Sequence, residues 1–433
     1  MSLRRLLLAA TAATVTWLAS VAVASAAPIA SPHVVTLVES REDVSVSTGR
    51  LERSLGFASS DTYAYALRGF AAPLTPAQIE TLRDHPSVVS VVPDVEISAA
   101  GRKGSPAPVV SEQLPVGVER IGAAGKGAAS SAVAVLDTGL DLANRELNAS
   151  HGINCVKNGK PAQDDDGHGT HVGGTIAARA DGGGVIGVAP GSRLYAVKVL
   201  DASGKGRLSG LLCGIEWVRA NAERLGIRVA NVSITAAGSD DGACGARDGS
   251  PLHAAICNSV GAGIVYVAAA GNAGVDFAST APAAYGEVLT VTAATDTDGR
   301  EGGTGGAACV ADESDDSSGT YSNFATSEAA AAHTVAAPGT CVVSSGVGGG
   351  VTAMLGTSMA APHVTAAAAL CIGSDDGAGP CATSDPALLA SNVTRQLLAD
   401  AAQRSVEGFG FAGDPQSPLT GRHVGHLVSA LDY

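Results

Sequence analysis

The residues around Ser358 have the types and spacing that nucleophilic catalysis needs. Ser358 follows a glycine and a threonine in Gly356-Thr357-Ser358-Met359, and an alanine-rich run continues to Leu370. That run is almost wholly apolar, so it predicts a buried helix. A serine at a helix start lies against unpaired N–H groups and the positive end of the dipole, which would stabilise an oxyanion. Taken alone, Ser358 is better explained as an ordinary helix cap. The chemical interpretation therefore needs a base, a carboxylate and an oxyanion donor elsewhere.

Three further stretches supply those groups in order along the chain. Ala134-Val135-Leu136-Asp137 predicts a buried strand that ends in a carboxylate. The stretch Asp164–Thr175 places His168 at the head of a helix of small residues. Val265–Asn272 predicts another buried strand, which ends in an amide side chain. Chemistry in open α/β sheets gathers at the C-terminal ends of the strands, so we expect these groups to meet there.

Together these four motifs resemble the subtilisin-like serine proteases (subtilases), whose catalytic residues run Asp, His, Ser along the chain. The resemblance implies that Asp137 orients the imidazole, that His168 is the general base and acid, and that Ser358 is the nucleophile. It implies that Asn272 donates to the oxyanion beside the N–H of Ser358. The implied protein is a secreted serine endopeptidase that works through an acyl-enzyme and is made as a self-processing zymogen.

Two other functions stay open at this point. One is a processing protease dedicated to a single partner substrate. The other is a catalytically silent secreted binding protein of the same fold, against which the presence of all four chemical residues counts. In each case the resemblance implies a parallel α/β sheet with helices on both faces, preceded by a small α+β ferredoxin-like domain.

The first 26 residues have the features of a secretory signal peptide. Arg4 and Arg5 precede an apolar run, and Ala24-Ser25-Ala26 forms a small-residue cleavage site. Threonines and a serine interrupt the run, which favours a signal peptide over a membrane anchor. No later stretch approaches about 20 continuous apolar residues, so we expect no transmembrane helix and an extracellular location.

Residues 27–104 are expected to form a propeptide, with a β-α-β-β-α-β order. Strands are predicted at Val34–Leu37, Tyr63–Phe70 and Val88–Val95, and helices at Ser47–Leu55 and after Thr75, which would cap a helix beginning at Pro76. With Gly69-Phe70, this region resembles the subtilase propeptide, which implies a folding assistant and an intramolecular inhibitor. Gly101–Pro115 predicts a linker, with the maturation bond within it or just before it.

Residues 105–433 are then the peptidase domain with its leading linker. Hydrophobic residues make up 45% of the chain and charged residues 16%, which is typical of a globular protein with a large core. The formal net charge is −14, which argues against nucleic acid or anionic membranes as partners. We expect peptide or protein substrates, and a monomer.

All eight cysteines lie in this domain, and their even number behind a signal peptide predicts disulfides. None has C-x-x-C spacing, which disfavours zinc, and the sequence alone leaves every connectivity open. The resemblance to secreted bacterial subtilases favours pairing in sequential order, which is Cys155–Cys213, Cys244–Cys257, Cys309–Cys341 and Cys371–Cys381.

The stretch Ala230–Ala236 resembles the family's substrate-binding strand, with one departure. Thr235 and Ala236 stand where the family usually has two glycines. Substrate would pair with this strand through its main chain, so a branched threonine should narrow the specificity pocket or the pocket beyond it. We hypothesise poor cleavage after bulky residues, which a strong preference for Phe would contradict. The expected substrate-binding residues are Ser233, Ile234, Thr235, Ala236, Ala270 and Gly271.

No cofactor is expected for the chemistry, but the resemblance adds a candidate structural calcium site. The segment Arg179–Val185 falls where the family has a calcium loop. Glu146 and Asp181 would supply carboxylates, and the carbonyls of Arg179, Gly183 and Val185 would supply further oxygens. The glycines at 182–184 equally predict a plain turn. The acidic run at 164–166 is interpreted as a solvated loop, and His171 and His363 as packed helical histidines.

Overall fold

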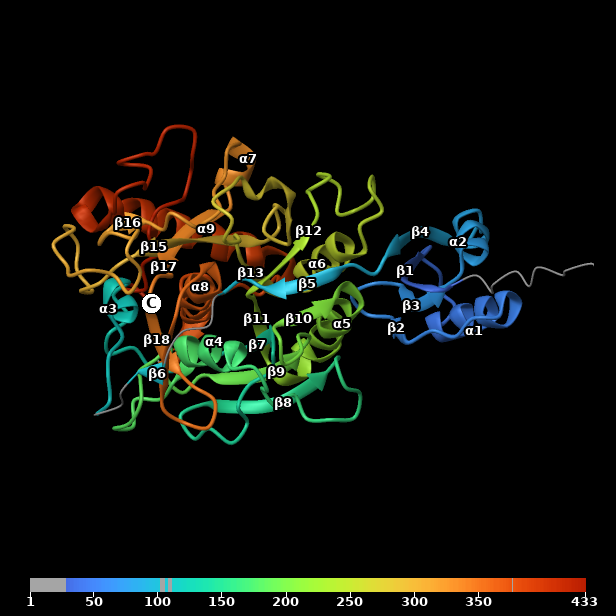
Figure 1. Cartoon of the computed structure of the whole chain (residues 1–433), viewed down its shortest axis with the longest axis horizontal. Helices are drawn as coiled ribbons and strands as arrows, with labels where there is room; N and C mark the ends of the chain where they lie inside the picture. Colours follow the sequence, from blue (N-terminus) through green and yellow to red (C-terminus); the bar gives the residue numbers. More distant parts are fainter. Residues whose placement is uncertain (1–28, 102–105, 108–110, 376) are drawn as a thin grey trace, which may run out of the picture.

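The computed structural model describes residues 29–101, 106–107, 111–375 and 377–433. The predicted signal peptide at 1–26 and much of the predicted linker lie outside these residues. Figure 1 shows a small lobe that carries α1, α2 and β1–β4 beside a larger lobe that carries the rest of the chain.

The small lobe has the predicted β-α-β-β-α-β order. Its elements are β1 (Ser31–Leu37), α1 (Val44–Leu55), β2 (Asp61–Tyr63), β3 (Gly69–Leu74), α2 (Pro76–Arg83) and β4 (Val88–Pro93). The strands lie in the order β2-β3-β1-β4, and β1 is antiparallel to both of its neighbours. Thr75 caps α2 as predicted, in a capping box with Gln78. Both helices pack on one face of the sheet around Val35, Phe70 and Leu82.

The prediction of one strand over Tyr63–Phe70 was wrong. The chain bends between β2 and β3, so residues 64–68 belong to neither strand. In this bend the N–H groups of Ala64, Tyr65 and Ala66 all point at the carboxylate of Glu216 in the large lobe. The alternation of apolar residues that predicted a strand therefore coincides with a contact between the lobes.

A parallel sheet forms the centre of the large lobe. Its strands lie in the order β16 (Ser317–Ser318), β15 (Leu289–Thr295), β13 (Val265–Ala269), β11 (Ile227–Val232), β7 (Ala132–Asp137), β9 (Arg193–Lys198) and β8 (Asn148–Asn154), and β17 (Thr334–Pro338) also pairs with β15. All these pairs are parallel except β15–β16. Parallel strands need helices on both faces, and the sequence provides them.

Alternate residues of β7 point into two separate cores. Val133 and Val135 belong to the core beneath α4 (His168–Ala177), α8 (Thr357–Ile372) and α9 (Leu389–Arg404). Ala134 and Leu136 belong to the core beneath α5 (Leu208–Leu225) and α6 (Pro251–Val260). The predicted α/β architecture is therefore confirmed.

Short elements complete the large lobe. They are β5 (Glu96–Ala99), β6 (Pro106–Ala107), α3 (Val116–Arg120), β10 (Lys205–Arg207), β12 (Ile234–Ala237), η1 (Phe277–Ser279), β14 (Thr280–Ala281), α7 (Glu328–Ala331), β18 (Val342–Ser345), β19 (Val351–Met354), β20 (Gly373–Ser374), β21 (Gly377–Ala378), η2 (Pro386–Leu388) and η3 (Ser405–Phe409). Although β5 follows the small lobe in sequence, it runs into the large lobe and pairs there (Figure 1).

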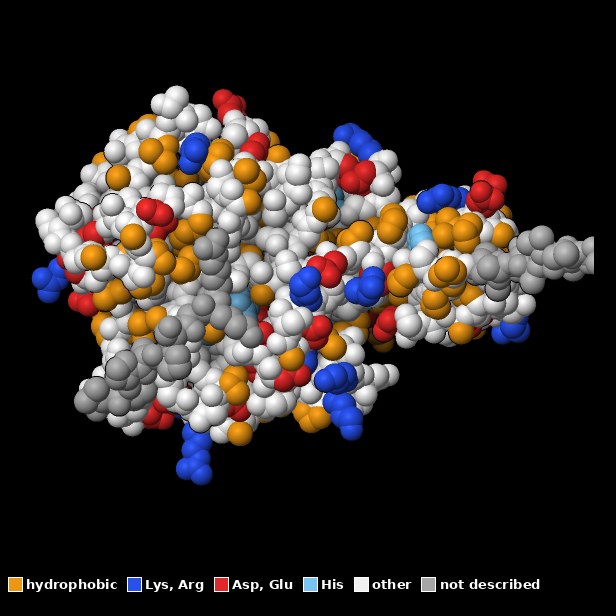
Figure 2. All heavy atoms as spheres, viewed as in Figure 1, with side chains coloured by type: hydrophobic (Ala, Val, Ile, Leu, Met, Phe, Trp, Pro, Cys, Tyr) orange, Lys and Arg blue, Asp and Glu red, His pale blue; other side chains and the backbone are white. Residues whose placement is uncertain are grey.

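Four disulfides join the cysteines in sequential order: Cys155–Cys213, Cys244–Cys257, Cys309–Cys341 and Cys371–Cys381. In the described part of the chain, every helix is too short or too polar to cross a bilayer. On the face that Figure 2 shows, Lys and Arg side chains are interspersed with Asp and Glu rather than gathered in one patch.

Candidate active site

The side chains of the four predicted chemical residues converge at the C-terminal edge of the parallel sheet. Asp137 is the last residue of β7, and His168 is the first residue of α4. Asn272 follows β13 by three residues, and Ser358 lies in the first turn of α8. Asp137, His168 and Ser358 are buried, and Asn272 is half-buried. The edge thus brings a carboxylate, an imidazole, an amide and a hydroxyl together beneath the residues that precede Gly101.

The carboxylate of Asp137 holds the ring of His168 in one orientation. Nδ1 of His168 lies 2.8 Å from Oδ1 of Asp137. The N–H of Thr138 donates to the same oxygen at 2.7 Å. With Nδ1 carrying the proton, Nε2 is left as the acceptor that a general base requires. Nε2 has no hydrogen-bond partner among the described residues, and a Cβ atom added at Gly101 would lie 2.7 Å from it, so this nitrogen faces the backbone of Gly101.

The environment of His168 favours its protonated form. Burial alone would lower the pKa of His168, because the imidazolium loses its hydration. The carboxylate of Asp137, and beyond it the charges of Asp166 and Asp164, outweigh burial and raise the pKa above its ordinary value of 6.5. Chemistry that needs neutral His168 therefore weakens as the pH falls through a value above 6.5.

The carbonyl of Ala100 occupies the position expected of a reacting carbonyl. Its oxygen accepts hydrogen bonds from the N–H of Ser358 at 3.1 Å and from Nδ2 of Asn272 at 2.5 Å. The amide of Asn272 is oriented by Thr357, whose N–H and Oγ1 donate to Oδ1 at 2.9 and 3.0 Å. Two donors aimed at one carbonyl oxygen form the geometry of an oxyanion hole.

The hydroxyl of Ser358 is turned away from the imidazole in this structure. It donates to the carbonyl of Ser233 at 3.1 Å. Serine reaches another staggered rotamer by rotation about one bond, so a change in χ1 is required before Oγ can donate to Nε2 of His168. In this structure the carbonyl of Ala100 therefore occupies the site, while Oγ of Ser358 is not yet oriented toward His168.

The strand β5 lies in the cleft as an extended peptide would. Ala99 is opposite Ile234 and Ser98 is opposite Thr235 in an antiparallel pairing with β12, and the N–H of Ala100 donates to the carbonyl of Ser233 at 3.0 Å. On its other side, β5 pairs with β10. The segment before Ala100 is thus held by main-chain hydrogen bonds along both edges.

The prediction of a single strand over Ala230–Ala236 was wrong. The chain breaks at Ser233 into β11, which belongs to the central sheet, and β12, which pairs with β5. The buried side chain of Asn231 explains the break, since its amide donates to Oγ of Ser233 and its Oδ1 accepts from Thr365 of α8. Ala270 and Gly271 lie between β13 and Asn272, where the carbonyl of Ala270 accepts from Asn323.

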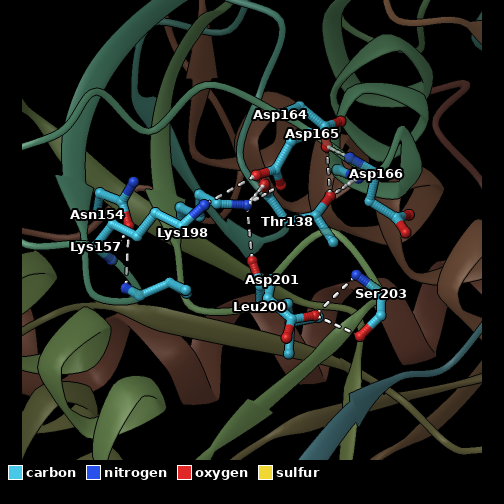
Figure 3. Close-up of polar contacts among 12 residues, drawn as sticks. Thr138, Asn154, Lys157, Asp164, Asp165, Asp166, Lys198, Leu200, Asp201 and Ser203 are labelled. Carbon is cyan, nitrogen blue, oxygen red and sulfur yellow. Dashed lines mark hydrogen bonds and ion pairs between the residues drawn. The ribbon is translucent and has the colours of Figure 1, made fainter.

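A buried lysine behind the site was missed by the sequence analysis. Figure 3 shows the ammonium group of Lys198 between Thr138 and Asp165. It donates to the carbonyls of Thr138 and Leu200 at 2.5 and 2.9 Å and to Oδ1 of Asp165 at 2.6 Å. A lysine at the end of the apolar run Tyr195-Ala196-Val197 was the available signal. Lys198 therefore ties the loop that carries His168 to the residue beside Asp137.

The prediction of a solvated loop at residues 164–166 was wrong for Asp164, which is buried. Oδ1 of Asp164 accepts from the hydroxyl of Thr138 (Figure 3). It also accepts from the N–H of Gly167, and Oδ2 accepts from the N–H and hydroxyl of Thr170. Asp166 accepts from the N–H of His168. These carboxylates fold the loop and orient the start of α4.

The two other helical histidines pack as predicted. Nε2 of His171 bonds the carbonyl of Val342, and Nδ1 of His363 bonds that of Met359. Burial lowers the pKa of His171 to about 3 and that of His363 to about 4. Both rings are therefore neutral at ordinary pH.

In the candidate calcium segment, two carboxylates flank a glycine backbone. A Cβ atom added at Gly183 would lie 3.9 Å from Oε1 of Glu146 and 4.0 Å from Oδ1 of Asp181. Gly184 has a φ of +58 and no side chain, and the carboxylate of Glu146 occupies the space that a Cβ atom there would fill. Burial raises the pKa of Glu146 and the charge of Asp181 raises it further, although the N–H of Val185 opposes both. The N–H of Arg179 donates to the carbonyl of Glu146, which holds the two segments together.

Comparison with known proteins places these observations in a family. A family profile described as the Subtilase family matches residues 128–415, and one described as Peptidase inhibitor I9 matches residues 27–100. The chain is 34% identical over 307 residues to "Alkaline protease" of Shouchella clausii, which covers 69% of this chain and 67% of that protein. It is 36% identical over 270 residues to "Subtilisin Savinase" of Lederbergia lenta, which covers 60% of this chain and 84% of that protein. A crystal structure of a cold adapted subtilisin-like serine proteinase superposes with a TM-score of 0.54 at 27% identity, over 73% of this chain and 98% of that one.

Proposed function

The chain belongs to the subtilase family and is a subtilisin-like serine endopeptidase with an inhibitor-type N-terminal region, and on that premise we propose that Ser358, His168 and Asp137 are its catalytic residues. The observation that carries the proposal is the carbonyl of Ala100, held by the N–H of Ser358 and by Asn272 above the start of α8. These are the contacts that acyl transfer requires at the oxygen of the carbonyl under attack.

The reaction then follows from the positions of these groups. Oγ of Ser358 rotates from the carbonyl of Ser233 to Nε2 of His168, loses its proton to that nitrogen and attacks the carbonyl carbon. The N–H of Ser358 and Nδ2 of Asn272 stabilise the tetrahedral oxyanion. His168 gives its proton to the leaving amine, and water, deprotonated by His168, hydrolyses the acyl-enzyme. Asp137 keeps the imidazole in the required tautomer and stabilises its protonated form. No cofactor takes part.

We propose that the enzyme matures by cleaving its own chain between Ala100 and Gly101. The propeptide then spans residues 27–100 and the peptidase domain begins at Gly101, four residues before the boundary that the linker composition had suggested. The match of the inhibitor profile ends at residue 100, which supports this boundary.

Contacts between the lobes support inhibition by the same region. The start of α5 has no side-chain cap of its own. Asp94 fills that position, since its carboxylate accepts from the N–H and Oγ of Ser209 at 2.8 Å each. Glu216, farther along α5, accepts the three N–H groups of residues 64–66. The propeptide thus stays bound through α5 as well as through β5.

We further propose that the protease acts outside the cell as a monomer, on peptides or proteins. The predicted signal peptide supports this location, and so do the four disulfides, which form in oxidising compartments.

Fluorophosphonate labelling tests the catalytic assignment. With the propeptide removed, we expect the reagent to modify only Ser358, since His168 activates that hydroxyl. The labelling rate should fall about tenfold per pH unit once the pH drops below the pKa of His168, which lies above 6.5. Peptide mapping by mass spectrometry locates the label. A label on another residue, or a rate that does not depend on pH, would refute the assignment, and a His168→Ala variant serves as the slow control.

We also propose a structural calcium ion beside Gly183. Glu146 and Asp181 would contribute carboxylate oxygens, and neighbouring carbonyls, such as those of Arg179, Gly183 and Val185, would complete a shell of oxygen ligands. Calcium at about 100 times its dissociation constant should stabilise the fold by about 2.7 kcal/mol, a rise of several degrees in Tm. Calorimetry with calcium and with a chelator measures it. Asp181→Asn should lose most of the rise, whereas Asp248→Asn, on an exposed loop, should keep it. Equal Tm values with and without calcium would reject the site.

A further inference from the structure

This inference rests on the proposed function and concerns the residue whose carbonyl is attacked. When the carbonyl of Ala100 lies in the oxyanion hole, the methyl group of Ala100 points into the pocket that any substrate must fill at this position. Ala100 is 4% exposed, so this methyl group is already enclosed. The size of the pocket beyond it determines which substrates are cleaved.

Thr235 forms one wall of that pocket. Side chains along a strand alternate between faces, and Ile234 and Ala236 pack toward the core beneath α5. Thr235 therefore points to the opposite side, toward the loop that carries Ala270 and Gly271. Its methyl group, Cγ2, would lie 3.5 Å from a Cβ atom added at Gly271.

The distance between Thr235 and Gly271 gives the width of the pocket. One carbon–carbon bond, about 1.5 Å, separates that added Cβ from Cα of Gly271, so Cα lies no more than about 5 Å from Cγ2 of Thr235. A flat ring between two walls needs a contact of about 3.5 Å on each side, which is about 7 Å between the wall atoms. A phenyl ring therefore does not fit between Thr235 and Gly271.

The opposite wall does not move aside easily. An added Cβ at Gly271 would also lie 2.5 Å from Nδ2 of Asn323. That amide donates to the carbonyl of Ala270 at 2.9 Å, and its Oδ1 accepts from the N–H groups of Ala273 and Val275. Asn323 thus holds the loop in place, and displacing the loop would break these hydrogen bonds.

We propose that Thr235 restricts this protease to substrates with a small residue, such as alanine, immediately before the cleaved bond. The seated segment Ile97-Ser98-Ala99-Ala100 is the first such substrate. Its large side chain is Ile97, which is 1% exposed and whose Cγ1 would lie 3.3 Å from a Cβ atom added at Gly206. The side chain of the fourth residue before the bond thus anchors the substrate. The residue immediately before the bond is selected because the narrow pocket excludes large side chains.

The test uses quenched peptides of sequence Ile-Ser-Ala-Xaa-Gly with Xaa as Ala, Leu or Phe. For the matured enzyme we expect kcat/KM for Ala to exceed that for Phe by about 100-fold, with Leu between them. In Thr235→Gly the ratio of Phe to Ala should rise by about tenfold or more. In Thr235→Val, which keeps the branched shape, the ratio should stay as in the wild type. Because each result is a ratio, a general loss of activity cancels.

The outcomes distinguish failure of this proposal from failure of the proposed function on which it rests. If no peptide is cleaved, the proposed function fails. If the wild type cleaves Phe as well as Ala, or if Thr235→Gly leaves the ratio unchanged, only the restriction fails. The precursor gives a second readout when a variant cannot be purified: Ala100→Phe should slow self-cleavage in the wild-type background, and Thr235→Gly should restore it. Failure of this rescue would overturn the proposal as well.

Discussion

Expressed as the full chain, the Ser358→Ala variant is expected to keep residues 27–100 joined to the peptidase domain. The wild type should yield a mature protein whose first residue is Gly101. The physical reason is the position of Ala100, whose carbonyl oxygen accepts from the N–H of Ser358 and from Nδ2 of Asn272, beside the residue that carries the proposed nucleophile. Loss of the nucleophile in a subtilisin lowers kcat by about 10⁶, so cleavage should stop on any practical timescale. Intact mass and N-terminal sequencing measure both products.

A second serine provides the matched control for this experiment. Ser391 lies on the exposed face of α9, and its hydroxyl donates to the carbonyl of Leu388. Ser391→Ala should mature like the wild type. If Ser358→Ala is still cut at Gly101 in a protease-deficient host, Ser358 is not the residue that cleaves the precursor. If the wild type is cut elsewhere, the contact at Ala100 does not mark the maturation bond.

Much of the site could be predicted because its side chains lie in short stretches of sequence at the ends of strands or the starts of helices. Asp137 and Asn272 follow continuous apolar runs, and a parallel sheet must bring such ends to one edge. The helix that follows Ser358 could be predicted as buried from its own residues, because a run of small apolar side chains has no polar face to turn toward solvent. Local pattern and the order along the chain were therefore enough to predict that these four side chains meet at one edge of the sheet.

What could not be predicted depends on contacts between distant parts of the chain. The bend at residues 64–68 exists because Glu216, about 150 positions later, binds three of its N–H groups. The break at Ser233 depends on Asn231 and Thr365, and no local signal marks it. The role of Ala100 depends on β12 and α8 together. Composition predicted a linker over a range of residues, and a single bond within or beside that range is proposed only from the contacts of the Ala100 carbonyl.

Asn272→Ala is expected to lower kcat by about 10²–10³ and to leave KM almost unchanged. The amide contacts a neutral carbonyl in the bound substrate, and its hydrogen bond strengthens only when that oxygen becomes an oxyanion. Removing it therefore raises the barrier without weakening the ground state. The measurement is kcat and KM on Ile-Ser-Ala-Ala-Gly with the matured enzyme, together with the half-time of precursor cleavage, which should lengthen by a similar factor while the cleaved bond stays the same.

Asn272→Asp separates the lost donor from the lost packing. The aspartate has the same size and can still accept from the N–H and hydroxyl of Thr357, which hold Oδ1 in the present structure. It offers no N–H to the substrate and brings a negative charge toward the oxyanion. Its kcat should therefore fall at least as far as that of Asn272→Ala. If Asn272→Asp keeps most of the activity, the amide acts through packing, and the N–H of Ser358 alone must carry the oxyanion.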